Sequence, residues 1–216
     1  ITRILVAPSF LYRVESSVSD AGIESLSDWE LASRLSYFLW SSSPDPALRA
    51  AAASQQMTTS EDLRRQVNRM LADDKSRRLA TEFFGQWLGF YRFDEFGGID
   101  PQRVPEFDRE LKSAMYREAQ NFFAHIIQAD RPVDEMIFAD YTFVNAALAD
   151  HYAVPFAAQR TMVEQDIFLQ THISDGQRGG LFGLGAVLAT TSAPLRTSAV
   201  KRGDWILRRI IGTPVP

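Results

Sequence analysis

Apolar side chains recur every three or four residues along most of this chain, and that spacing constrains its fold more than any other feature. The clearest stretch runs from Pro105, a favourable first helical residue, to about Gln128. It predicts an amphipathic helix with one buried face, the longest helix that we expect. That face carries Phe107, Leu111, Met115, Phe122 and Ile126.

Start and stop signals predict further helices around this one. Ser27 and Glu30 form a capping box, in which the two residues satisfy each other's free N–H groups at the start of a helix. The other expected helices cover residues 2–13 with a kink or break at Pro8, 47–53, a segment capped by Thr59 or Ser60, 75–91, 133–138, a segment capped by Asp140 or Thr142 that runs through His151, 177–188, and a last segment capped by Thr197 or Ser198 that runs to about Ile211.

The segment from Tyr152 to Gln177 has little helical periodicity. Its residues 163–169 include β-forming Val163, Ile167 and Phe168, which favour a short strand. Glycines in 177–188 suggest close packing of that helix against a neighbour. The sequence therefore predicts an all-α fold, an irregular helical bundle. It also allows one short hairpin near residues 160–172.

Composition excludes several classes of protein. A net charge of −4 argues against a non-specific nucleic-acid binder. The absence of cysteine excludes disulfides, thiolate zinc sites, iron–sulfur ligation and covalent haem attachment in this chain. No apolar run is long enough to span a bilayer. The chain starts at Ile1 and ends in a proline-terminated segment, so we read it as a piece of a larger protein.

The polar, basic turn TTSAPLRTSAVKRGD lies between two apolar helices and is the most plausible place for a site. A helix N-terminus beside arginines resembles an anion site; the simpler interpretation is helix capping and ion pairing within the bundle. The candidate ligand- or partner-binding residues are Arg178, Thr191, Ser192, Arg196, Thr197, Ser198, Lys201 and Arg202.

A second cluster contains Asp140, Asp150 and His151. Asp140 or Asp150 could orient His151 as a general base, and the same two carboxylates are the candidate acid or base of a polysaccharide hydrolase or lyase. The simpler interpretation is that Asp140 caps a helix and His151 ends it. No catalytic motif is present, and the three histidines show no metal-binding spacing, so we expect no metal site.

Six blocks carry a resemblance to a known family: LVAPSFLYRVE, LASRLSYFLWSSSPDPAL, RRQVNRMLADDKSRRLATEFFGQWLGF, PEFDRELKSAMYREAQNFF, FADYTFVNAALADHYAV and RGGLFGLGAVLATTSAPLRTSAVKRGDWILRRIIGTPVP. They resemble domains of unknown function from large secreted proteins of planctomycetes and related bacteria, commonly found in the same chain as a c-type cytochrome domain. The resemblance implies two adjacent domains of that family, 1–130 and 131–216, the second packed on the first, or else a single compact unit.

The same resemblance implies a function only through its context. It suggests a periplasmic or exported protein in which this chain supports redox chemistry by packing on a haem-bearing domain of the same parent chain. The chain would then be part of an oxidoreductase, with no cofactor of its own and haem c in another domain. The alternatives are a structural or interaction module without catalysis and the polysaccharide-active enzyme. The sequence does not specify an oligomeric state.

Overall fold

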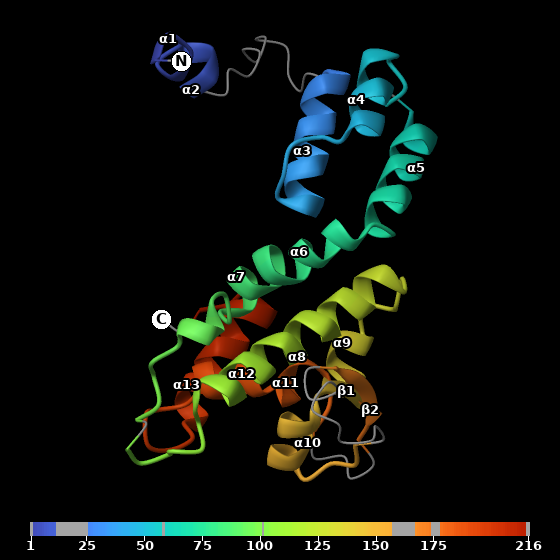
Figure 1. The fold of residues 1–216 in the computed structure, drawn as a ribbon. Helices are drawn as coiled ribbons and strands as arrows, with labels where there is room; N and C mark the ends of the chain where they lie inside the picture. Colours follow the sequence, from blue (N-terminus) through green and yellow to red (C-terminus); the bar gives the residue numbers. More distant parts are fainter. Residues whose placement is uncertain are drawn as a thin grey trace.

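A computed structural model of the chain is mostly helical and contains one small antiparallel sheet (Figure 1). It describes residues 2–11, 26–57, 59–100, 102–156, 167–173 and 178–214. The expected helical fold is confirmed. The helices are α1 (Thr2–Leu5), α2 (Pro8–Leu11), α3 (Asp28–Trp40), α4 (Pro46–Ala53), α5 (Ser60–Leu71), α6 (Arg77–Leu79), α7 (Gly85–Leu88), α8 (Arg109–Gln128), α9 (Glu135–Phe138), α10 (Ala146–Tyr152), α11 (Gly180–Gly183), α12 (Gly185–Thr190) and α13 (Ala199–Trp205), and the strands are β1 (Tyr141–Val144) and β2 (Leu169–His172).

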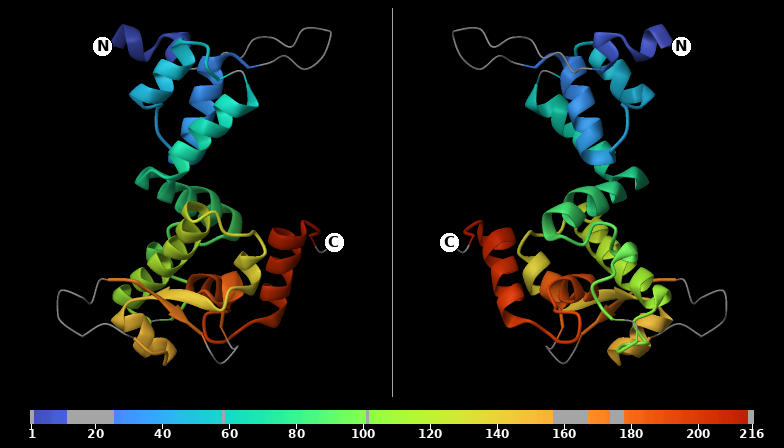
Figure 2. Two further views of the ribbon diagram at one scale, coloured as in Figure 1. Left: turned by 90° about the vertical axis from the view of Figure 1, so that its right-hand side faces the viewer. Right: turned by 90° about the vertical axis from the view of Figure 1, so that its left-hand side faces the viewer.

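Helices α3, α4 and α5 form a cluster at one end of the molecule (Figure 2). Their buried side chains form a second hydrophobic core together with Met57 and Leu79. The capping box at Ser27 and Glu30 is present, and Thr59 caps α5, as predicted. The Trp40 side chain is fully buried, and its indole Nε1 donates to the carbonyl of Met70 at 2.9 Å. Local capping signals thus fix where α3 and α5 begin, and the buried indole of Trp40 joins α3 to the end of α5.

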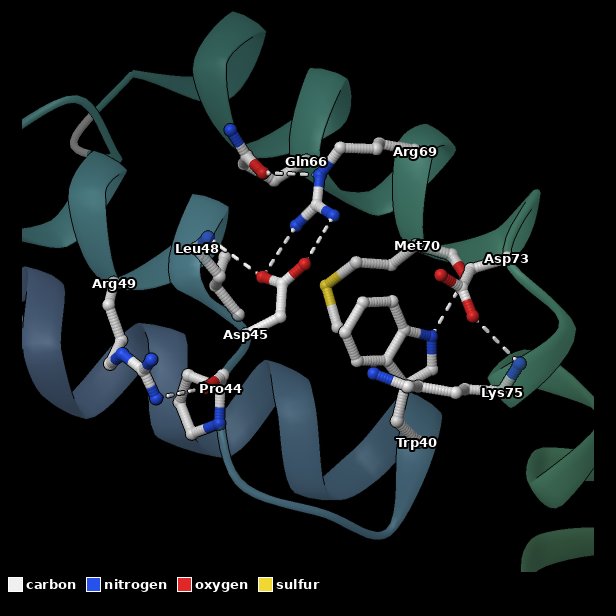
Figure 3. Close-up of polar contacts among 10 residues, drawn as sticks. All are labelled: Trp40, Pro44, Asp45, Leu48, Arg49, Gln66, Arg69, Met70, Asp73 and Lys75. Atoms are coloured by element: carbon white, nitrogen blue, oxygen red, sulfur yellow. Dashed lines mark hydrogen bonds and ion pairs between the residues drawn. The ribbon is translucent and has the colours of Figure 1, made fainter.

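Asp45 connects two helices of this cluster (Figure 3). Its carboxylate accepts from the backbone N–H of Leu48 at the start of α4, and it also pairs with the guanidinium of Arg69 on α5 at 2.8 Å. Burial by itself raises the pKa of Asp45, but the hydrogen bond and charge of Arg69 and the bond from Leu48 together outweigh it, so the pKa is lowered. One side chain therefore both caps a helix and ties it to its neighbour.

A continuous helical run joins this cluster to the larger body of the molecule (Figure 1). It includes α6, a π-helical stretch at Ala80–Phe84 and α7. The run ends at Leu88, before the expected end at Tyr91, because Gly89 adopts φ 84° and the N–H of Tyr91 turns back to the carbonyl of Gly85.

Helix α8 is the central element of the larger body and packs against α12, α10 and β1. It ends at Gln128 as expected but begins at Arg109, so the expected start at Pro105 is wrong. Asp108 caps the helix by accepting from the N–H of Leu111 at 2.8 Å, while residues 102–107 form turns ahead of it. The Asp108 cap takes precedence over the favourable proline.

The sheet pairs β1 with β2 in antiparallel register, from Tyr141 opposite His172 to Val144 opposite Leu169. Strand β2 begins at Leu169, the last residue of the expected strand 163–169, and its partner β1 is distant in sequence. Residues 163–166 of that expected strand lie outside the described residues. The expected caps at Asp140 and Thr142 are wrong. Thr142 belongs to β1, and Asn145 caps α10 by accepting from the N–H of Leu148 at 3.0 Å.

The expected helix at 177–188 is two short helices, α11 and α12, separated at Leu184, whose backbone is extended. The predicted close packing is present at Gly185, where an added Cβ would lie 2.3 Å from the Tyr152 hydroxyl. Ser198 caps α13, which continues as a π-helical stretch, Ile206–Ile211. The indoles of Trp205 and Trp87 bond to the carbonyls of Leu88 and Arg209, and so fix this last helix against α7.

The larger core contains residues from Ala80 to Ala189, on both sides of the expected join at residue 130. In packing terms this region is one unit, while the division into domains at 130 and 131 stays a prediction. Among the described helices, none combines the length and apolar character needed to cross a membrane.

Candidate functional site

A cleft of about 350 Å³ opens where α8, α10, α12 and α13 meet the loop ahead of α8. This volume is within the range of small-molecule sites. The apolar part of its lining, here called the apolar floor, consists of Ile99, Val104, Phe107, Leu111, Met115, Leu188 and Ala189. Its polar lining consists of Glu106, His151, Tyr152, Arg178, Ser192, Thr197 and Arg202.

Directly behind the cleft wall lies a buried carboxylate, that of Glu118 on α8, which is only 1 % exposed. Three groups donate to it. Thr142 Oγ1 on β1 lies 2.6 Å from Oε1, and the Tyr152 hydroxyl lies 2.7 Å from Oε2. The N–H of Gly185, at the start of α12, lies 3.0 Å from Oε2. Three elements distant in sequence therefore meet at one side chain.

Burial is the dominant influence on this carboxylate and raises the pKa of Glu118 from its usual 4.5 to about 6. The bonds from Thr142, Tyr152 and Gly185 favour the ionised form and oppose the effect of burial, as does the charge of Arg178. The Tyr152 hydroxyl is correspondingly held neutral, because burial and the neighbouring Glu118 raise its pKa. Glu118 is thus a buried acid that titrates close to neutrality.

Arg178 connects this network to the cleft. Its guanidinium carbon lies 3.8 Å from the centre of the Tyr152 ring, a close cation–π contact. Nη1 donates to the carbonyl of Gly183 at 3.3 Å. Two glycines with positive φ follow it, Gly179 and Gly180, and a Cβ on Gly180 would lie 2.3 Å from the carbonyl oxygen of Ile137. Only glycine allows the backbone to pass here, so these residues position Arg178.

The polar side chains of the turn largely form hydrogen bonds within the turn and with the adjoining α12. The hydroxyls of Thr191 and Ser192 donate to carbonyls of α12, both at 2.7 Å. Lys201 Nζ donates to the carbonyl of Ser192 at 3.3 Å, and Arg202 Nε approaches Thr191 Oγ1 at 3.4 Å. Within the described part of the chain, no buried side-chain polar atom lacks a partner. The turn is therefore a hydrogen-bonded structure beside the cleft.

The structure brings together most of the candidate residues. Arg178, Ser192, Thr197, Arg202 and His151 all line the cleft. Thr191 is buried behind Arg202, and Ser198 and Lys201 begin α13. Arg196 is not among the lining residues; its backbone pairs with Ala193 in the turn.

Asp140 lies elsewhere. It lines two grooves, of about 320 and 520 Å³, which Phe138 also lines. Its carboxylate lies 3.3 Å from Nδ1 of His172, and neither groove is lined by His151 or Asp150. His151 itself belongs to the cleft, where desolvation and the charge of Arg178 lower its pKa and favour the neutral ring.

Sequence reasoning missed Glu118, Tyr152 and Gly185 as site residues. One signal was available for Glu118, because it follows Met115 by three residues and precedes Phe122 by four, on the apolar face of α8. A charged residue in such a position has to find partners inside the fold. The described residues contain no group of three or more His, Asp or Glu side chains that could hold a metal ion.

Fold and cleft together define a helical domain built around a buried glutamate. Comparison with known families places it further: a family model matches residues 26–154, more than half of the chain, so the chain belongs to the PSD4 family, described as a protein of unknown function (DUF1592). No curated protein and no solved structure matches it. The matched residues include Glu118, His151 and Tyr152 but end before Arg178 and the polar turn.

Proposed function

We propose that the chain is a binding domain of a larger exported protein and that its cleft faces a haem-bearing domain of the same parent chain. One observation carries this proposal: residues from α8, α10, α12 and the polar turn converge on a single cleft with an apolar floor and two guanidinium groups. The polar turn meanwhile bonds internally, which suits a preformed surface better than a reaction centre.

The cleft residues suit the edge of a haem group held by another domain. Arg178 and Arg202 present forked donors, the side chains that pair best with propionate carboxylates. The apolar floor suits an apolar ring edge. The haem would supply electron transfer within its own domain, while this chain would exclude water from that edge and fix the charge around the propionates.

Redox titration of the haem-bearing domain tests this proposal. We expect the domain's reduction potential to change when this chain is present, because nearby guanidinium charge and loss of water alter the stability of the oxidised haem. Arg202→Ala should remove most of the change. Arg208→Ala is the matched control, since Arg208 is exposed and pairs with Asp204 at 2.7 Å.

An unchanged potential together with no complex in size-exclusion chromatography would overturn the docking role. An equal effect of the two arginine variants would show that the cleft is not the contact.

A structural module without chemistry is the second candidate, favoured by the internally satisfied turn. It predicts a complex with the neighbouring domain but no change in its potential, so the same titration separates the two candidates.

A further inference from the structure

Resting on the proposed binding role of the cleft, we infer that its ligand is a carboxylate on an apolar body and that Glu118 takes up a proton when this carboxylate binds. Haem propionates and free organic acids share this chemistry, and the experiments below distinguish the two sources.

The lining of the cleft selects the ligand class. Seven apolar side chains form the floor, so the body of the ligand has to be apolar. Arg178 and Arg202 lie in the polar part of the lining and offer planar forks that match a carboxylate. Glu106 is also in this lining and repels a carboxylate, so the ligand carboxylate has to bind at the two arginines and not beside Glu106. A short monocarboxylate satisfies all three conditions.

Arg178 already has an electrostatic partner when the cleft has no ligand. It lies against the ring of Tyr152, whose hydroxyl bonds to Glu118, and its charge stabilises the ionised carboxylate. A ligand carboxylate at Arg178 would add a second negative charge close to the first. In a low-dielectric wall, two carboxylates that share one cation cannot both be ionised without cost.

Proton uptake at Glu118 removes this conflict. The proton comes from solvent, and the ligand enters as an anion, so the net charge of the site does not change. The neutral carboxyl keeps its partners, because its new O–H can donate to Thr142 Oγ1 while Tyr152 and Gly185 continue to donate to the other oxygen. Binding and protonation then strengthen each other by the same factor.

The other ionisable groups around this network decide which control variants the experiment needs. Glu118 comes from α8 and Tyr152 and His151 from α10, while Arg178 precedes α11 and Arg202 comes from α13. Glu106 precedes α8, and its charge raises the pKa of His151 against the effect of Arg178. Among the described residues that line the cleft, His151 is the other group that a ligand carboxylate would help to protonate, and a variant has to separate its effect from that of Glu118.

Calorimetric titration with hexanoate, and with hexanamide as its neutral analogue, tests the inference on the whole chain. We expect hexanoate to bind about tenfold more tightly than hexanamide, as a charge-assisted bond is worth roughly 1.5 kcal/mol or more. Between about pH 7.5 and about pH 5.5, where the ligand stays ionised, hexanoate binding should strengthen about three- to tenfold. Titrations in two buffers of different ionisation enthalpy count the protons taken up by the unmodified chain.

Three variants assign the proton. Glu118→Gln should bind hexanoate with the same affinity at both pH values, because the amide mimics the protonated acid. His151→Asn and Glu110→Gln, the latter on the exposed surface of α8, should keep the pH dependence. Circular dichroism and thermal melting check that each variant folds.

The outcomes separate the parts of the account. Equal binding of hexanoate and hexanamide would overturn the ligand class. No proton uptake by the unmodified chain, or a pH dependence lost in His151→Asn and kept in Glu118→Gln, would overturn the role of Glu118. Proton-linked hexanoate binding without any effect on the haem-bearing domain would support this inference and reject the docking role.

Discussion

Glu118 is the residue on which the architecture of this domain depends most. A buried carboxylate is costly unless it is bonded on every side, and here a strand, a helix and a helix N-terminus each supply one donor. Because burial outweighs these bonds, the folded protein holds the proton of Glu118 to higher pH than the unfolded chain does. Its contribution to stability is therefore fully present below about pH 4.5 and is lost as the pH rises through about 6.

Glu118→Gln tests this sign. The amide does not titrate, so the variant does not lose stability with pH at this position. Its unfolding free energy minus that of the unmodified protein should therefore rise by about 2 kcal/mol between about pH 4 and about pH 7. Urea unfolding at several pH values measures the difference, and Glu110→Gln provides an exposed carboxylate for comparison. A difference that stays constant with pH would contradict the account.

At the scale of elements, the close packing of helices decides which residue types a given position can accept. Gly185 begins α12 against α8 and α10, and a side chain there would meet the Tyr152 hydroxyl and, at 2.7 Å, Met115 Cγ. Gly203, within α13, has nothing within 4 Å of an added Cβ. The two glycines therefore have opposite roles, although both lie in short helices.

Substitution by alanine should show this contrast. Gly185→Ala is expected to destabilise the protein by about 1–3 kcal/mol through overpacking and to weaken ligand binding in the cleft. Gly203→Ala should instead leave stability unchanged or raise it by up to about 1 kcal/mol, because alanine favours helix. Thermal or urea unfolding of the two variants measures both effects. Equal effects would show that the packing at Gly185 is not as tight as described.

The same scale shows what the sequence can reveal. The starts of α3, α5 and α13 follow from capping residues next to them in the chain, Ser27, Thr59 and Ser198. The pairing of β1 with β2 was not predictable, because its partners are separated by α10 and a long connection. Most candidate cleft residues came from a basic polar turn. Glu118 and Tyr152 came only from the structure, since their roles depend on contacts between distant segments.

At the scale of the whole molecule, the cleft needs more of the chain than the matched family region. Residues 26–154 supply α8 and α10, while Arg178, α12 and Arg202 follow them. Five apolar residues that follow the matched region are buried in the larger core: Leu181, Leu184, Ala186, Val187 and Ala189.

A fragment of residues 26–154 should therefore lose cooperative unfolding in its α8 region. Without α12 the apolar face of α8 is exposed, and Glu118 loses the N–H donor of Gly185. Hydrogen exchange should show α8 unprotected in the fragment and protected in the full chain, with protection in α3–α5 similar in both. Full protection of α8 in the fragment would show that the larger core does not require the C-terminal helices.

The most direct test of the account is the titration of the Glu118 carboxyl carbon by nuclear magnetic resonance, with and without hexanoate. The account predicts that the pKa of Glu118 is about 6 in the free protein and rises when hexanoate is bound. A pKa close to the usual 4.5 of a glutamate, unchanged by hexanoate, would contradict both the buried network and its link to the cleft.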